Sequence, residues 1–252
     1  MQNICRELTD GTRCVYAWWL DMHTRIDILL HAPGEEAKLI AAAERIKSLV
    51  SKLEQIGNKF DSKSELYSLN HAPSRPVRVS AMLYDMVSRC IELNRLTEGL
   101  FDVTVGSSDF TPGTPTPISL CASDSTIDFG GRQTSIDLSG FIKGYALDRI
   151  RLLLRDGGVP DALVSLGNSS VMTMGRVTSP VTEACLTTSG NDTPSRSHII
   201  NPLTGERIKG KRAISVVTAG GAEGEALAKA LFIASPECAP ALLQKFSATL
   251  KI

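Results

Sequence analysis

The feature that most constrains the fold is a strand-like segment followed directly by a long amphipathic helix. Residues 22–31, MHTRIDILLH, alternate in polarity and are rich in branched side chains, which predicts a strand. Over residues 35–56, apolar side chains recur at helical spacing between charged ones, and Gly57 follows. The pattern therefore predicts a helix that packs one face on a sheet.

Later segments mix strand-like and helix-like patterns without the regular rhythm of a doubly wound sheet. A second helix is predicted over about residues 80–96, capped by Ser80, and a third begins near Ser139. Short strands are predicted at 161–166, 170–175, 183–188, 212–219 and 248–252, and helices at 222–235 and 237–246. Gly167 and Asn168 form a tight turn between two of these strands. The order predicts an α+β fold, with residues 1–252 forming a single compact unit of two interlocked α/β layers.

Composition limits the partners. The 252 residues are 42% hydrophobic, enough to bury a full core. Lysine plus arginine equals aspartate plus glutamate at 27 each, so no global charge favours nucleic acid or an anionic membrane. The apolar run at 15–20 is too short for a membrane helix, and no transmembrane segment is expected.

The six cysteines have neither C-x-x-C spacing nor a histidine companion, which argues against a zinc site or a redox pair. Free thiols in a reducing compartment are the favoured interpretation, and three extracellular disulfides remain the alternative.

Residues 107–126 are rich in proline, threonine and serine and show no periodicity. Such a segment has too few apolar side chains to anchor itself, so we expect a mobile loop or lid.

The segment DLSGFIKGYALD at 137–148 indicates a nucleotide site. Gly140 and Gly144 bracket Lys143, an arrangement that lets main-chain N–H groups and a cation approach a phosphate at a helix N-terminus. Taken alone, the segment is also an ordinary helix start with Asp137 or Ser139 as the cap.

Other local patterns follow in a fixed order along the chain. They are FDSKSELYSLNH at 60–71, TEGLFDVTVG at 97–106, LVSLGN at 163–168, TTSGN at 187–191, HIINPLTGE at 198–206 and EALAKALF at 225–232. Together with 137–148 they resemble the ApbE family, from about residue 22 to 233. The resemblance implies the α+β fold and an FAD:protein FMN transferase, which splits FAD and attaches FMN through its phosphate to a Ser or Thr of an acceptor flavoprotein subunit.

The resemblance also implies residues that bind the flavin nucleotide. Those at matching positions are Met22, Phe60, Ser64, Asn70, Asp102, Thr104, Asp137, Gly140, Lys143, Gly167, Ser189, Gly190, His198 and Thr204. His198 is the candidate to orient a phosphate or shuttle a proton, and a histidine capping a turn is the alternative. Phe60 stands where the family often has a tyrosine, with a core position as its alternative.

In the family a magnesium ion is held by a backbone carbonyl, here that of Gly140, and by Asp and Thr side chains one helical turn apart. This chain has Glu225 and Lys229 at those two positions. A charged lysine has no lone pair and cannot ligate a metal. Three interpretations stay open: a metal held by Glu225 with Gly140, Lys229 supplying the positive charge as a catalytic residue beside His198 and Glu225, or loss of catalysis.

Two classes of function follow from this. The first is the FMN transferase; the second is a catalytically silent flavin-binding or scaffold protein, with an FAD hydrolase releasing FMN and AMP as an intermediate case. Many members of the ApbE family are exported lipoproteins, and the location of this chain stays open. The sequence as written favours the cytoplasm, and a periplasmic or membrane-anchored location is the alternative if a signal segment was removed. Cys5 and Cys14 lack the apolar run that precedes a lipidated cysteine.

Overall fold

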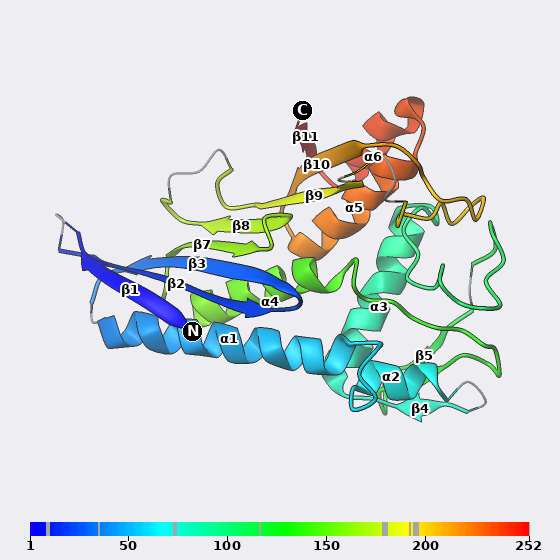
Figure 1. Ribbon diagram of the computed structural model, residues 1–252, viewed down its shortest axis with the longest axis horizontal. Coiled ribbons are helices and arrows are strands. Elements are labelled where there is room, and N and C mark those ends of the chain that lie inside the picture. Colours follow the sequence, from blue (N-terminus) through cyan, green and yellow to red (C-terminus); the bar gives the residue numbers. More distant parts are fainter. Residues whose placement is uncertain are drawn as a thin grey trace.

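The computed structural model describes residues 1–8, 11–34, 36–72, 75–115, 117–177, 181–191, 193 and 197–251. Its main sheet has eight strands in the order β1-β2-β3-β7-β8-β9-β10-β11, and neighbouring strands pair antiparallel (Figure 1). The strands are β1 (Gln2–Glu7), β2 (Arg13–Asp21), β3 (Thr24–Ala32), β7 (Asp161–Leu166), β8 (Ser170–Met174), β9 (Cys185–Asn191), β10 (Arg212–Thr218) and β11 (Thr249–Lys251).

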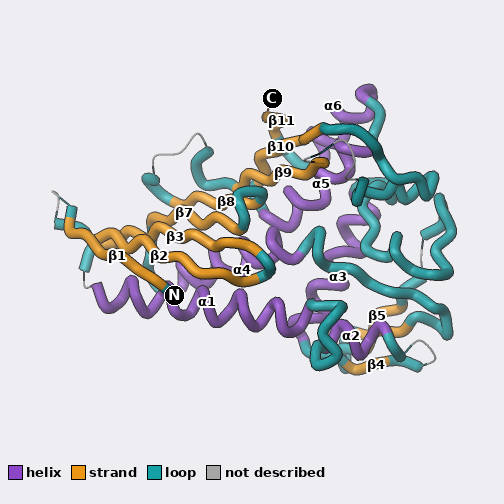
Figure 2. Tube along the Cα trace, viewed as in Figure 1, coloured by secondary structure: helices purple, strands orange, loops and turns teal. Residues whose placement is uncertain are grey.

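A long insertion separates β3 from β7, although these two strands are hydrogen-bonded neighbours. It holds α1 (Glu36–Gly57), α2 (Glu65–Asn70), α3 (Ala81–Leu96), α4 (Ile142–Asp156) and a small sheet of β4 (Val77–Arg78), β5 (Ser119–Cys121) and β6 (Thr126–Asp128). In Figure 1, α1 and α4 run along one side of the main sheet. Figure 2 shows that loops dominate the end of the molecule that holds the small sheet.

Helix α1 covers the first half of the sheet because its apolar residues share one face. Its buried residues are Leu39, Ala42, Ala43, Ile46, Val50, Leu53 and Ile56, and the helix contacts β2, β3 and α4. At its C-terminus, an added Cβ on Gly57 would lie 2.6 Å from the Cδ1 atom of Ile142. This close approach brings the residues after α1 to the beginning of α4.

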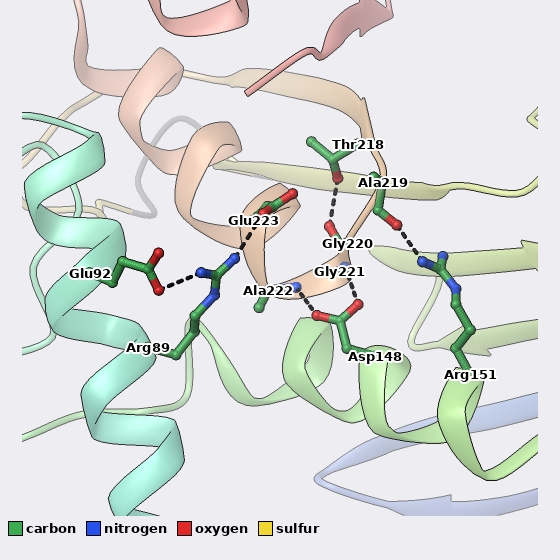
Figure 3. Close-up of polar contacts among 10 residues, drawn as sticks. All are labelled: Arg89, Glu92, Asp148, Arg151, Thr218, Ala219, Gly220, Gly221, Ala222 and Glu223. Atoms are coloured by element: carbon green, nitrogen blue, oxygen red, sulfur yellow. Dashed lines mark hydrogen bonds and ion pairs between the residues drawn. The ribbon is translucent and has the colours of Figure 1, made fainter. Parts of the chain in front are cut away.

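Helix α5 (Gly221–Ile233) covers the second half of the sheet, where it contacts β9 and β10 and also α4. A 3-10 turn (Pro236–Cys238) and α6 (Ala239–Lys245) lead from it to β11. The N-terminus of α5 is held by the Asp148 carboxylate, which accepts hydrogen bonds from the N–H groups of Gly221 (2.6 Å) and Ala222 (2.9 Å), as Figure 3 shows. Burial raises the pKa of Asp148, and the two backbone donors offset this only in part.

Replacing Asp148 with alanine is expected to lower the free energy of unfolding by about 1–2 kcal/mol, the usual cost of losing a helix cap. The change can be measured by urea denaturation. Glu98→Ala is the control, because the Glu98 carboxylate is exposed and pairs with Lys245 at the surface, so its loss should leave the stability nearly unchanged. Equal stability of the Asp148 variant and the unmodified protein would show that the capping contacts do not hold α5.

The α+β class predicted from the sequence is confirmed, and so are the turn at Gly167 and Asn168 and the cap at Ser80, whose side chain accepts from the Leu83 N–H. Strands β1 and β2 and helix α2 were not predicted. The third predicted helix begins at Ile142 instead of near Ser139. The predicted helix over 237–246 starts as the 3-10 turn, because Pro236 and Pro240 interrupt regular hydrogen bonding.

The segment 107–126, expected to be a mobile lid, is attached at several points, apart from residue 116, which lies outside the described residues. The Ser107 hydroxyl donates to the Ser135 carbonyl (3.1 Å), and the Gly113 N–H donates to the Pro202 carbonyl (3.0 Å). Strand β5 of this segment pairs with β6, which begins at the last residue of the segment. The mobility of this segment stays a prediction, but the segment is hydrogen-bonded to other parts of the fold.

The six cysteines are free thiols, as favoured from their spacing. None of the helices in the described ranges is both long and apolar enough to cross a bilayer.

Candidate functional site

A cleft of about 830 Å³ opens where the two halves of the main sheet meet the beginning of α4. This volume suits a small-molecule or cofactor site, for which about 300–1,000 Å³ is usual. The cleft is lined by Met22, His23, Thr24, Glu54, Gly57, Asn58, Lys59, Phe60, Asp137, Ser139, Gly140, Ile142, Lys143, Gly167, Ser169, Thr188, Ser189, Gly190, His198, Ile199, Glu225 and Lys229.

The fold brings most of the predicted site residues together here. Those that line the cleft are Met22, Phe60, Asp137, Gly140, Lys143, Gly167, Ser189, Gly190, His198, Glu225 and Lys229. They come from the β2–β3 turn, the end of α1, the beginning of α4, the β7–β8 turn, β9, the segment after it, and α5.

Five predicted residues do not line the cleft. Asn70 lies behind it, where its side-chain amide bonds both the N–H and the carbonyl of Ile136 at 2.9 Å. The Asp102 carboxylate accepts from the N–H (2.7 Å) and the hydroxyl (2.6 Å) of Thr104, and this turn presents the Val103 carbonyl to the N–H of Asp137. These contacts brace the segment that leads into α4, so Asn70, Asp102 and Thr104 act from outside the cleft.

The other two of the five belong to local turns. Ser64 is the N-cap of α2 and accepts from the Tyr67 N–H at 2.9 Å, with its own hydroxyl bonded to the Asn58 carbonyl. Thr204 accepts from the Glu206 N–H at 3.3 Å and is exposed. Neither residue lines the cleft.

The beginning of α4 faces the cleft with no side-chain cap. Asp137 does not cap the helix; its carboxylate instead accepts from the Ser139 N–H at 2.9 Å, and the residue at the cap position is Phe141. A helix N-terminus without a capping side chain leaves N–H groups and a partial positive charge for an anion. The ordinary-cap alternative for this segment is therefore wrong.

Two lysines flank one buried carboxylate. Glu225 is 4% exposed, and its carboxylate accepts from the Ser170 hydroxyl (2.6 Å) and from the Lys229 ammonium (2.8 Å). The Lys143 ammonium bonds the hydroxyl of Ser169. Burial lowers the pKa of Lys143, and the Lys229 charge lowers it further while Glu225 raises it. The group formed by Lys143, Glu225 and Lys229 therefore holds two ammonium groups and one carboxylate, an excess of one positive charge at this part of the cleft.

A second charged pair and an aromatic ring lie at the end of α1. Lys59 bonds the Asp137 carboxylate at 2.7 Å and lies 5.0 Å from the centre of the Phe60 ring. Burial raises the pKa of Asp137, but hydrogen bonds from Lys59 and Ser139 outweigh it and hold the pKa below its usual value. Phe60 is 81% exposed, so its alternative as a core residue is wrong. Its ring is open for stacking.

The donor set at Gly140, Glu225 and Lys229 does not fit a divalent cation. Both oxygens of the Glu225 carboxylate are engaged, and an added Cβ on Gly140 would lie 2.7 Å from the Cε atom of Lys229. The cationic side chain thus stands beside the residues expected to ligate the metal. Within the described ranges, no three His, Cys, Asp or Glu side chains are grouped to hold a metal ion.

The sequence patterns did not single out several residues that line the cleft, among them His23, Glu54 and Lys59. Met22 and His23 form a two-residue hairpin turn with φ of 48° and 55°, and the Met22 N–H donates to the Glu54 carboxylate at 2.9 Å. Left-handed non-glycine residues are uncommon and gather at functional sites. Lys59 had a local signal, since it follows the helix stop at Gly57 and Asn58 directly before Phe60.

Comparison with known proteins agrees with the resemblance to the ApbE family noted in the sequence. A sequence model of the ApbE family matches residues 22–251. An FAD:protein FMN transferase of Klebsiella pneumoniae (strain 342) is 27% identical over 163 residues, covering 54% of this chain and 47% of the relative. The chain thus aligns with about half the length of this curated relative.

Solved structures share the fold. The flavin transferase ApbE from Vibrio cholerae superposes with a TM-score of 0.77 at 21% identity, covering 95% of this chain and 93% of the other. The apo form of the Pseudomonas stutzeri flavinyl transferase ApbE gives a TM-score of 0.81 at 16% identity, covering 95% and 91%. With the family's sequence model matching nearly the whole chain, this protein belongs to the ApbE family.

Proposed function

We propose that this protein binds FAD in the cleft and transfers its FMN moiety to a Ser or Thr hydroxyl of an acceptor protein. The observation that carries the proposal is the joint presence in one cleft of an exposed aromatic ring, Phe60, and two ammonium groups, those of Lys143 and Lys229. A phenyl ring can stack on an isoalloxazine, and ammonium groups near an uncapped helix N-terminus suit a pyrophosphate. The family relative that carries the transferase name supports the same activity.

The reaction is a phosphoryl transfer. The acceptor hydroxyl oxygen attacks the phosphorus next to the riboflavin moiety, the bond between that phosphorus and the bridging oxygen breaks, and AMP leaves with that oxygen. The hydroxyl proton must go to a base. His198 lines the cleft and is exposed, so its imidazole can meet the acceptor and pass the proton to solvent. The lysines would offset the charge that builds up on the phosphate oxygens.

The test is a titration of FAD with the purified protein, followed by the change in flavin fluorescence. Saturable quenching is expected, and AMP should then appear together with flavin that stays attached to an acceptor protein on a denaturing gel. AMP with only free FMN would show a hydrolase instead. Folded protein that gives no saturable binding up to high micromolar FAD would overturn the proposal.

A further inference from the structure

We propose that the ammonium groups of Lys229 and Lys143 together hold the FAD pyrophosphate directly, in place of a divalent cation, so that FAD binding needs no metal. This inference rests on the proposed function, because it assigns the way in which the same cleft takes its substrate.

The position of Lys229 is the first support. Its ammonium lies 2.8 Å from a carboxylate oxygen of Glu225, 3.3 Å from the Glu225 carbonyl and 3.5 Å from the Ser189 hydroxyl. An added Cβ on Gly140 would lie 3.5 Å from the ammonium nitrogen. These contacts place a fixed positive charge among the oxygen atoms and the backbone turn that would otherwise surround a metal ion.

The burial of the pair separates it from an ordinary helix-surface ion pair. The Glu225 side chain is 5% exposed and that of Lys229 is 21% exposed, and both residues line the cleft. A surface pair at this spacing is worth only about 0.3–0.5 kcal/mol and faces solvent. Here the carboxylate fixes the lysine, and the lysine faces the site.

The charge balance is the second support. Lys143 hydrogen-bonds a neutral hydroxyl, that of Ser169, and the charges of Glu225 and Lys229 both act on its ammonium. Two ammonium groups against one carboxylate leave an excess positive charge, which is costly in a partly buried site unless an anion is bound. A doubly negative diphosphate diester meets this requirement without a metal.

The N-terminus of α4 also favours an anion beside Lys143, and it differs in this respect from the N-terminus of α5. The N–H groups of α5 are taken by the Asp148 carboxylate, whereas α4 begins with no side-chain cap (Figure 3 shows α5). An anion held by Lys143, in the first turn of α4, would also gain from the positive end of that helix.

The experiment measures the FAD dissociation constant by fluorescence in excess EDTA and in millimolar magnesium. Equal affinities are expected. Lys229→Met should weaken FAD binding about 10- to 100-fold in EDTA, the loss typical of a hydrogen bond to a charged group. This change leaves the buried Glu225 carboxylate without its ion-pair partner. A second variant with both Glu225→Gln and Lys229→Met keeps the net charge of this pair at zero, and the same loss of affinity is expected.

Lys245→Met is the matched control, because Lys245 makes an exposed ion pair with Glu98 outside the cleft and its loss should leave the FAD affinity unchanged. A variant with Glu225→Asp and Lys229→Thr restores two oxygen ligands one turn apart. It should bind Mn²⁺ in the presence of FAD, detected by electron paramagnetic resonance, whereas the unmodified chain should not.

The inference is overturned if the unmodified protein binds FAD only with magnesium, or if both Lys229 variants bind FAD in EDTA as tightly as the unmodified chain. Those outcomes leave FAD binding itself intact. Failure of the proposed function looks different, since folded protein would then bind FAD under neither condition.

Discussion

Replacing Gly144 with alanine is expected to destabilise the protein by about 3 kcal/mol or more, at the upper end of the cost of overpacking. The added methyl group would lie 2.2 Å from the carbonyl oxygen of Gly221 and 2.6 Å from the Cγ atom of Glu225. The first of these atoms belongs to the backbone of α5, whose N-terminus is held to α4 by Asp148. Helices α4 and α5 must therefore separate to admit the methyl group.

Chemical denaturation measures this change, with Gly106→Ala as the matched control. An added Cβ on Gly106 meets no atom within 4 Å, so that substitution should leave the free energy of unfolding nearly unchanged. The separation of α4 from α5 should also move Glu225 away from Ser170 and weaken FAD binding in whatever fraction stays folded. A Gly144→Ala protein as stable as the control would show that the two helices can part at little cost.

Phe60→Ala is expected to weaken FAD binding about 10- to 100-fold, because stacking of a flat ring on an aromatic side chain contributes about 1–3 kcal/mol. The free energy of unfolding should not change, since the ring is 81% exposed and leaves no cavity when removed. A large effect on affinity without an effect on stability is the signature of a residue that serves the ligand alone.

The affinity for FAD can be measured by flavin fluorescence, and two further variants serve as controls. Phe60→Trp keeps a stacking surface and should bind FAD nearly as well as the unmodified protein. Leu203→Ala removes another exposed apolar side chain, 47% accessible and outside the cleft, and should have no effect. If Phe60→Ala binds FAD as tightly as the unmodified protein, the Phe60 ring does not contribute to FAD binding.

The elements with strong local signals were predictable from the sequence. Helix α1 has a continuous apolar face and a glycine stop, and Ser80 caps α3 with its side chain, so both were found. Strand β1 is mostly exposed and is held by pairing with β2 across the sheet, which no local pattern of residues 2–7 reveals. Its existence depends on tertiary hydrogen bonds rather than on burial.

Some residues of the candidate site were likewise predictable from the sequence, and others were not. Lys143 and Gly140 could be found because a glycine-flanked lysine at a helix start has a local physical meaning. Glu225 and Lys229 were found because the resemblance to the ApbE family aligns them with its metal-site positions. Glu54 could not be found, because its role is to accept the N–H of Met22 from a distant hairpin turn. Contacts of this kind appear only after the helix and the turn are packed together.

The pairing of β3 with β7 determines when the main sheet and the cleft can form during folding. Asp27 pairs with Ser165 and Ile28 with Val164. The centre of the sheet therefore closes only when the two ends of the long insertion between these strands come together. Long loop closure costs entropy before contacts compensate for it, whereas the hairpins of β2–β3 and β7–β8 form locally and fast. Because the cleft takes residues from both sides of this closure, flavin binding should be the last property that a refolding chain regains.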